Sequence, residues 1–187
     1  MTITSPNRRP HGNIELKARL SNLDAARKVA RELPAENAGV LSQTDTYFHC
    51  PNGRLKLREF ADRPAELIWY ARDNQQQAKR SDYHLAPVVN PETLKLSLAA
   101  ALGVRVVVKK RRELFLYQNV RIHLDQVDGL GEFLEFEAVL PQNSESDPDA
   151  AQNAGRNLVA WLQERFALSP ESLVAESYSD LLISLAS

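Results

Sequence analysis

Charged residues recur at every second position in several short stretches of the chain, with Leu, Ile or Phe between them. In a β-strand, alternate residues lie on the same face. Each stretch therefore predicts a strand with one charged face and one apolar face. The stretches are Asn13-Ile14-Glu15-Leu16-Lys17, Arg54-Leu55-Lys56-Leu57-Arg58, Arg121-Ile122-His123-Leu124-Asp125 and Glu135-Phe136-Glu137.

The rest of the pattern predicts about eight strands with helices inserted or appended. Asn52-Gly53 indicates a tight turn between two strands. Asn90 and Gly103 indicate the start and end of a helix. Four helices are expected, over 21–33 and 91–102 and beginning at Asp147-Pro148 and at Ser169-Pro170. The expected strands cover 12–20, 44–50, 53–60, 65–72, 81–88, 104–117, 120–128 and 132–140.

Short connections favour antiparallel pairing of neighbouring strands. A strand with a fully charged face cannot bury that face in an apolar core. We therefore predict an α+β fold in which eight antiparallel strands close into a β tunnel with a wet, charged interior and flanking helices outside. Residues 12–187 would form this single domain, after a disordered tail over residues 1–11, with a polar linker at 141–147.

Composition narrows the class of protein. A chain of 187 residues with 43% hydrophobic and 25% charged residues is typical of one globular domain. No apolar run approaches the roughly 20 residues that span a bilayer, and the first residues do not form the apolar segment of a signal peptide. Cys50 is the only cysteine, which excludes an internal disulfide and a cysteine-based zinc site. We expect a cytoplasmic protein that does not bind membranes.

The net charge of −1 hides an uneven distribution of charge. Residues 105–121 are predominantly basic, and acidic residues predominate from Glu132 onwards. Nucleic-acid-binding domains usually have a pI above about 9, whereas this sequence has a pI of about 6.4. A confined basic pocket for a small anion fits this distribution better than a nucleic-acid surface does.

The basic strands predict the anion that they would hold. Like charges opposite each other on neighbouring strands repel, so an anion should lie between them, although a solvated sheet face remains the alternative for any single strand. Arg side chains match phosphate oxygens with two parallel hydrogen bonds, and Lys adds charge. In the run from Lys109 to Arg112, either Lys109 and Arg111 or Lys110 and Arg112 face inward.

Acidic residues at alternate positions suit a hard divalent cation, which takes carboxylate and phosphate oxygens as ligands. Glu135 and Glu137 together favour a metal site, whereas a single carboxylate such as Glu15 or Asp125 could instead orient an inner Arg. His123 lies on the same face, and a hydrogen-bonded strand histidine is favoured over a catalytic base.

Together these motifs resemble those of the CYTH superfamily, also called triphosphate tunnel metalloenzymes. The resemblance covers nearly the whole chain in order and implies an eight-stranded tunnel that holds a triphosphate with Mg²⁺ or Mn²⁺. The family motif opens with Glu-x-Glu-x-Lys, and Asn13 replaces its first Glu; an amide oxygen can ligate a cation but brings no charge. The matching stretches are Asn13–Lys17, Asp45–Phe48, Gly53–Glu59, Tyr70–Arg72, Lys109–Arg112, Val120–Gly131, Phe133–Glu137 and Ser177–Leu182.

The combined interpretation is a metal-dependent enzyme acting on a small-molecule triphosphate. Hydrolysis is favoured over cyclisation of ATP by a class IV adenylate cyclase, and a non-catalytic polyphosphate-binding module is a further alternative; a homodimer is left open. Lys17 would orient the end phosphate or its attacking water. The expected phosphate clamps are Arg54, Lys56, Arg58, Arg72, Lys110, Arg112 and Arg121, and the expected metal ligands are Glu15, Asp125, Glu135 and Glu137.

Overall fold

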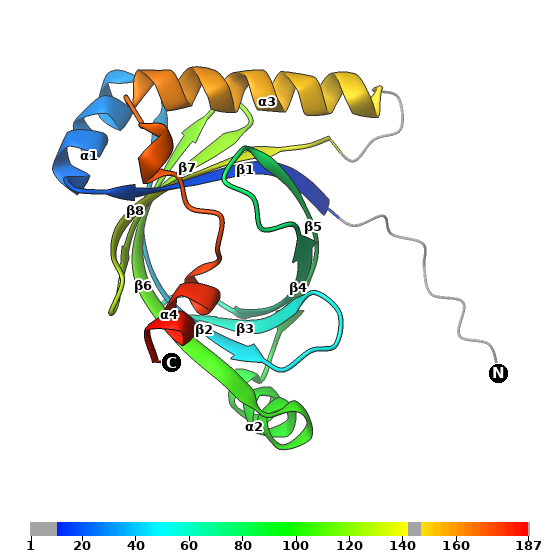
Figure 1. The fold of residues 1–187 in the computed structure, drawn as a ribbon. Helices are drawn as coiled ribbons and strands as arrows, with labels where there is room; N and C mark the ends of the chain where they lie inside the picture. Colours follow the sequence, from blue (N-terminus) through cyan, green and yellow to red (C-terminus); the bar gives the residue numbers. More distant parts are fainter. Residues whose placement is uncertain (1–10, 142–146, 187) are drawn as a thin grey trace.

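The structure is a computed structural model that describes residues 11–141 and 147–186. Eight antiparallel strands close into a barrel in the order β1-β5-β4-β3-β2-β6-β7-β8 (Figure 1). The closed tunnel predicted from the charge pattern is confirmed. The strands are β1 (His11–Leu20), β2 (Glu36–Phe48), β3 (Arg54–Phe60), β4 (Ala65–Arg72), β5 (Lys79–Val88), β6 (Val104–Tyr117), β7 (Val120–Val127) and β8 (Gly131–Val139).

The two faces of β1 show how the strands separate charge from apolar packing. Ile14 and Leu16 belong to the main apolar core on the outside of the barrel, whereas Glu15 and Lys17 line its interior. In the pairing of β1 with β8, Glu15 lies opposite Glu137. The period of two residues therefore brings carboxylates from neighbouring strands together inside the barrel.

Helices α1 (Leu23–Glu32) and α3 (Pro148–Arg165) contact β1, β7 and β8 from outside (Figure 1). The core beneath them includes Leu124 and Phe136 from the strands and Leu162 from α3, each exposed by 1% or less. Full burial of such a side chain contributes roughly 1.5–3 kcal/mol. This packing keeps the apolar strand faces out of the barrel interior.

Helix α2 (Pro91–Leu102) covers β2 and β3 on another side of the barrel. It begins and ends as the sequence predicts, because the Asn90 side chain accepts a hydrogen bond from the Thr93 N–H at 3.1 Å and Gly103 has φ 77°. Leu94 and Leu98 on its inner face pack against a buried cluster formed by strand residues.

Strand β2 begins at Glu36, eight positions before the expected strand over 44–50. Asn37 and Gly39 have low strand propensity, so local sequence does not predict a strand over this segment. The segment pairs with the long β6 strand through a register shift between Asn37 and Gly39. Tertiary pairing therefore extends a strand that local propensity does not predict.

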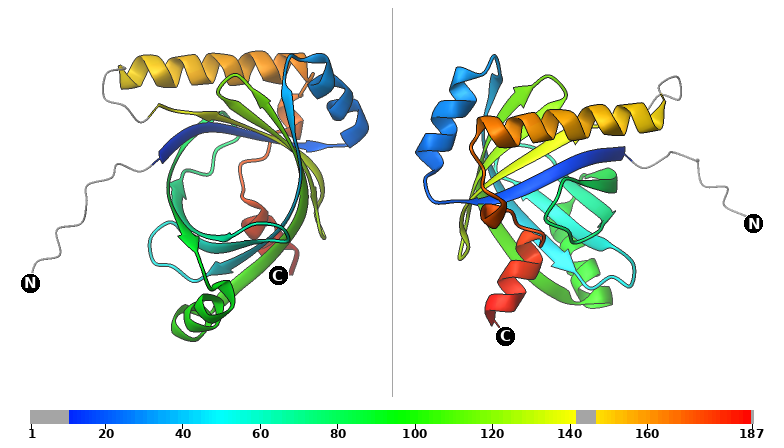
Figure 2. Two further views of the ribbon diagram at one scale, coloured as in Figure 1. Left: turned by 180° about the vertical axis from the view of Figure 1, so that it is seen from behind. Right: turned by 45° about the horizontal axis from the view of Figure 1, so that its top comes forward.

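The expectation of a helix beginning at Ser169-Pro170 is wrong. A single 3₁₀ turn, Pro170–Ser172, is followed by an extended segment, and α4 (Tyr178–Ala186) begins only at Tyr178. The Val174 N–H donates to the Lys17 carbonyl at 2.9 Å, which holds the segment beside β1 in extended form. Figure 2 shows this segment leading from α3 to α4.

Residues 1–10 of the expected tail and 142–146 of the expected linker lie outside the described residues, and His11 already belongs to β1. In the described part of the chain, no helix combines the length and apolar character needed to cross a membrane.

Candidate functional site inside the barrel

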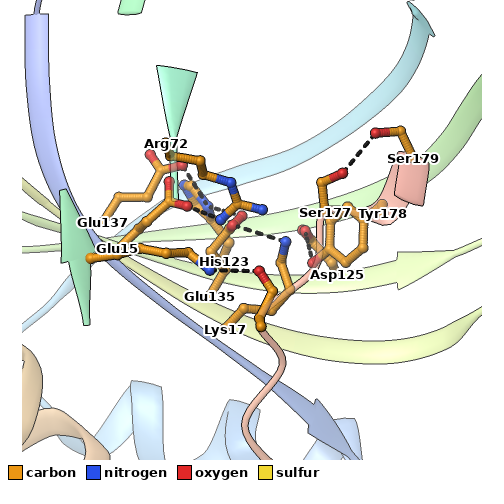
Figure 3. A network of polar contacts seen from close by, with 12 residues as sticks. Glu15, Lys17, Arg72, His123, Asp125, Glu135, Glu137, Ser177, Tyr178 and Ser179 are labelled. Carbon is orange, nitrogen blue, oxygen red and sulfur yellow. Dashed lines mark hydrogen bonds and ion pairs between the residues drawn. The ribbon is translucent and has the colours of Figure 1, made fainter. Parts of the chain in front are cut away.

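A cavity of about 280 Å³ occupies the barrel interior and is lined by residues from all eight strands. Ser177 and Tyr178, at the start of α4, add to this lining. Charged side chains from β1, β4, β7 and β8 point toward one another inside the barrel and face Tyr178 (Figure 3). The cavity is therefore lined by charged side chains, as the alternating pattern indicates.

Three cations on one side of the cavity converge on a single carboxylate, Asp45 of β2. Arg58 donates to both of its oxygens at 2.7 and 2.8 Å. Lys56 and Lys110 each place Nζ within hydrogen-bond distance of Oδ2, at 3.0 and 3.1 Å. Burial acts to raise the pKa of Asp45, but attraction from the three cations holds it well below its usual range. Asp45 is therefore ionised and gathers the cations.

The open question about the β6 basic run is answered by burial. Lys110 and Arg112 are buried inside the barrel, whereas Lys109 and Arg111 are exposed outside it. Burial is the main cause that lowers the pKa of Lys110 to about 7, with neighbouring Arg58 adding to the effect.

Carboxylates and one imidazole gather on the opposite side of the cavity. Nδ1 of His123 lies 3.5 Å from Glu135 Oε2 and 3.9 Å from Glu137 Oε1. One ligand atom from each of these three residues lies within 4.8 Å of the others. Burial acts to raise the pKa of Glu137, but the nearby Arg121 lowers it to about 2. Glu137 is therefore ionised at neutral pH and can bind a cation.

Glu15 and Lys17 extend this acidic group along β1. Glu15 forms an ion pair with Arg72 of β4, and burial together with the nearby Glu135 raises its pKa. Lys17 lies 3.4 Å from Glu135 Oε1, and its Nζ sits 4.0 Å above the Tyr178 ring. Each carboxylate is thus held beside a cation, so the acidic and basic groups form one continuous network.

The donor set fits a hard divalent cation. The side-chain oxygen of Asn13 is buried and has no hydrogen-bond partner among the described residues. Asn13 and Glu15 share the inner face of β1, next to Glu137 of β8. Carboxylate and amide oxygens with one imidazole suit Mg²⁺ or Mn²⁺. The residues that could hold such an ion are Glu15, Glu135 and Glu137, with His123 and Asn13 beside them.

Asp125, an expected metal ligand, is not one of the three residues whose ligand atoms lie within 4.8 Å of one another, and it shares the Arg112 guanidinium with Glu135. Arg112 donates to both of its oxygens at 2.7 and 2.6 Å, and the Tyr178 hydroxyl donates to Oδ2 at 2.9 Å. Its side chain is completely buried. Asp125 therefore orients Arg112 and anchors Tyr178.

The expected phosphate clamps also divide into two groups. Arg112 and Arg121 line the cavity and pair with Glu135 and Glu137, respectively. Arg54 does not line the cavity. It donates instead to Asp180 of α4 at 2.7 Å, so the structure places it with the C-terminal helix.

Asp45 is the main site residue that the sequence analysis assigned no role. Its stretch, Gln43-Thr44-Asp45-Thr46-Tyr47, is polar at every position, and Gln43 and Tyr47 line the cavity. Because both faces of the stretch are polar, no alternation marks its inner face. The stretch lacks the run of like charges that marked the other strands.

Both the sequence and the barrel architecture are similar to those of known proteins. The CYTH domain profile matches residues 11–178. A protein from Pyrococcus horikoshii OT3, PH1012, has a similar structure with a TM-score of 0.77 and 25% identity, over 90% of this chain and 98% of that chain. A proposed adenylate cyclase from Vibrio parahaemolyticus gives a TM-score of 0.74 at 23% identity, over 93% of this chain and 99% of that chain.

A third similar structure is HpAC1 from Hippeastrum, a proposed adenylyl cyclase with a dominant triphosphatase activity. Its TM-score is 0.60 at 10% identity, over 94% of this chain and 95% of that chain. No curated protein sequence gave a significant match. The profile match spans most of the chain, and the barrel carries the expected charged interior. The chain therefore belongs to the CYTH domain family.

Proposed function

We propose that this protein hydrolyses a triphosphate in a reaction that depends on Mg²⁺ or Mn²⁺. The observation that supports the proposal most directly is the division of one cavity into a basic group around Asp45 and an acidic group around His123. Members of the CYTH family are metal-dependent and act on triphosphates. A polyanion with its counter-cation complements both groups at once.

The basic group would bind the phosphates. Lys56, Arg58 and Lys110 already converge on one carboxylate, and a phosphate offers more oxygens to the same donors. Arg72 contributes a buried Nε donor that has no partner among the described residues. Arg112 and Arg121 complete the expected set, whereas Arg54, bonded to Asp180, would have no phosphate-binding role.

Glu135 and Glu137 would hold the metal, with Glu15 beside them and His123 completing the donor set. A bound Mg²⁺ or Mn²⁺ would neutralise charge on phosphate oxygens and make a water molecule more acidic. Asp125 would act indirectly, because both of its oxygens hold Arg112 in place.

Hydrolysis of a terminal phosphate needs only an ordered water in line with the bond that breaks. The water oxygen bonds to the terminal phosphorus, and the bridging oxygen leaves with the bonding electron pair as part of a diphosphate. The proton released from the water passes to solvent. Catalysis of this kind comes mainly from positioning and charge stabilisation. Lys17, held 3.4 Å from Glu135, would orient the end phosphate or the water.

The identity of the product tests the proposal. Purified protein with Mg²⁺ or Mn²⁺ should release orthophosphate from inorganic triphosphate or ATP, and ATP should give no cyclic AMP. Cyclic AMP as the main product would replace hydrolysis with the adenylate cyclase reaction. Tight triphosphate binding without turnover would indicate a non-catalytic binding module, and a large gain of metal-dependent rate in Asn13→Glu would support that alternative.

A further inference from the structure

Tyr178, the first residue of α4, contacts the charged network of the cavity at three points, although it comes from the C-terminal segment and not from a strand. Its hydroxyl donates to Asp125 Oδ2 at 2.9 Å. The centroid of its ring lies 4.0 Å from Lys17 Nζ and 5.6 Å from Lys110 Nζ (Figure 3). One side chain therefore reaches both the acidic group, through Lys17, and the basic group, through Lys110.

The Tyr178 ring is held in place by its neighbours. It is 5% exposed and packs in a buried cluster with Tyr47 and Val108. Phe133 meets it edge to face, with the two ring centroids 4.9 Å apart. The hydroxyl bond to Asp125 fixes the far end of the side chain. A shift of the ring away from Lys17 would disturb all of these contacts.

The backbone that leads to Tyr178 is anchored to two strands. The Val174 N–H donates to the carbonyl of Lys17 on β1 at 2.9 Å. Lys79 of β5 is 1% exposed, and its Nζ donates to the Ala175 carbonyl at 2.7 Å. The extended segment shown in Figure 2 is thus tied to β1 and β5 just before Tyr178.

A second anchor follows Tyr178 within α4. Asp180 accepts hydrogen bonds from Arg54 of β3 at 2.7 Å and from Arg105 of β6 at 3.1 Å. Ser177 also donates to Asp180 at 2.7 Å, which caps the start of the helix. Ser177 and Tyr178 line the cavity, whereas Asp180 does not. Asp180 can therefore influence the cavity only through the residues that it holds.

An aromatic ring suits the environment of Lys17. Lys17 is 4% exposed and lies 3.4 Å from Glu135 Oε1. A lysine ammonium has three donors, and a second carboxylate beside it would occupy another of them. The face of a ring attracts the positive charge through its quadrupole instead. The ammonium is thus stabilised on one side while donors remain for a phosphate oxygen or a water molecule.

We propose that Tyr178 is a positioning residue for Lys17, and that the anchors of α4 act by holding the Tyr178 ring in place. This inference rests on the proposed triphosphatase function, in which Lys17 orients the end phosphate or the attacking water. The C-terminal segment is then part of the site. It serves the chemical step more than phosphate binding, because Lys56 and Arg58 are held by Asp45 instead.

Two substitutions separate the ring from the hydroxyl. Tyr178→Leu removes both, whereas Tyr178→Phe keeps the ring. With inorganic triphosphate and Mg²⁺, Tyr178→Leu should lower kcat by about tenfold or more, the effect of losing a buried contact between a cation and a ring. Its calorimetric Kd for triphosphate in EDTA should change by less than about threefold. Tyr178→Phe should restore kcat to within about threefold of the unaltered protein. Leu185→Gln, at a position of α4 that is 70% exposed, is the control and should change neither quantity.

Nuclear magnetic resonance supplies a measurement that does not need turnover. Lys17 Nζ lies over the Tyr178 ring, so the ring current should shift the signals of the adjacent Cε protons upfield in ¹³C-labelled protein. Their absence in Lys17→Met identifies these signals. Tyr178→Phe should keep the upfield shift and Tyr178→Leu should lose it. Thermal unfolding measures any loss of folding separately, and Tyr178→Met replaces Tyr178→Leu if the latter unfolds.

A double-mutant cycle tests the role of the α4 anchor. Asp180→Asn weakens the bonds to Arg54 and Arg105 and should lower kcat, though less than Tyr178→Leu does. Residues that act through one another have non-additive effects. In the Tyr178→Leu background, Asp180→Asn should therefore lower kcat by less than about twofold more. Full multiplication of the two effects, or an unchanged kcat in Asp180→Asn alone, would overturn the proposal that the anchor acts through the ring.

The outcomes separate the positioning role from the proposed function. Equal kcat in Tyr178→Phe and Tyr178→Leu, or a change in Kd as large as the fall in kcat, would overturn the positioning role while triphosphate hydrolysis stands. Absence of hydrolysis by the unaltered protein would overturn the proposed function. In that case the resonance measurement decides. Triphosphate should then move the Lys17 signals alike in the unaltered protein and Tyr178→Phe but differently in Tyr178→Leu, and the same response in all three would reject the positioning role.

Discussion

Asp45 and Arg58 form a two-bond ion pair inside the barrel, with Nε 2.7 Å from Oδ1 and Nη2 2.8 Å from Oδ2. Lys56 and Lys110 donate to the same carboxylate. One aspartate thus holds together three cations that would otherwise repel one another. The basic group is therefore organised before any phosphate binds, which lowers the ordering cost of binding.

Replacement of Asp45 tests this organisation. Asp45→Asn should lower the free energy of unfolding by about 3–5 kcal/mol, because removing one partner leaves buried charges without compensation. Denaturant unfolding in a buffer free of phosphate measures the loss, and inorganic triphosphate should restore more stability to the variant than it adds to the unaltered protein. Asp82→Asn is the control, because Asp82 forms a half-exposed ion pair with Arg80. This substitution should change the free energy of unfolding by less than about 1 kcal/mol. An Asp45→Asn protein of unchanged stability would contradict the account.

Triphosphate itself should stabilise the barrel. A ligand that binds only the folded protein adds about 2.7 kcal/mol at a hundredfold excess over its Kd. Millimolar triphosphate, and more weakly sulfate, should therefore raise the thermal midpoint, whereas sodium chloride at equal ionic strength should do much less. Lys56→Glu places an acid between Arg54 and Arg58 on β3 and should abolish the triphosphate-specific shift. Equal shifts from chloride and triphosphate would show that the basic residues face open solvent.

Lys110 should make stability depend on pH. Burial lowers its pKa to about 7 in the folded protein, whereas a lysine in the unfolded chain has a pKa of about 10.4. Between these values the unfolded chain binds more protons, so stability contributed by this group rises with pH. Between pH 7 and 9 the unfolding free energy of the unaltered protein should therefore increase relative to that of Lys110→Met. Parallel pH profiles for the two proteins would show that Lys110 is charged throughout.

Arg54 should behave differently from its neighbours on β3. It is bonded to Asp180 of α4 and to Asn74 at 3.0 Å. Arg54→Gln should therefore lower the thermal midpoint while changing the calorimetric Kd for inorganic triphosphate by less than about threefold. Lys56→Gln should weaken the same binding by about tenfold or more, since a charge-assisted hydrogen bond contributes roughly 1.5–3 kcal/mol. Equal weakening of triphosphate binding by both variants would indicate that Arg54 also binds phosphate.

Much of the barrel could be predicted because its signal is local. The alternation of charge with Leu, Ile or Phe along β1, β3, β7 and β8 depends only on the two-residue period of a strand. That period also placed Glu15 and Lys17 inside the barrel before any tertiary information was used. The inward pair on β6 could not be identified from local sequence, because four successive basic residues, Lys109 to Arg112, hide the alternation. The pairing of β6 with β2 and β7 determines which pair faces inward.

The missed features depend on contacts between distant segments. Asp45 meets Lys110 across 65 positions of sequence, and Arg54 meets Asp180 across 126. The segment around Val174 is extended because its backbone bonds to β1, although Pro170 had indicated a helix start. Local propensity carries no information about such distant partners. The contacts of Arg54 with Asp180 and of Asp125 with Tyr178 could therefore not be predicted from strand position alone.

The most direct test of the account measures orthophosphate release from inorganic triphosphate and from ATP, in Mg²⁺ or Mn²⁺ and again in EDTA. We predict release that EDTA abolishes and that Glu135→Gln reduces by about a hundredfold or more, since Glu135 contacts both Lys17 and Arg112 and belongs to the metal-donor group. Undiminished release in EDTA, or full activity in Glu135→Gln, would contradict it.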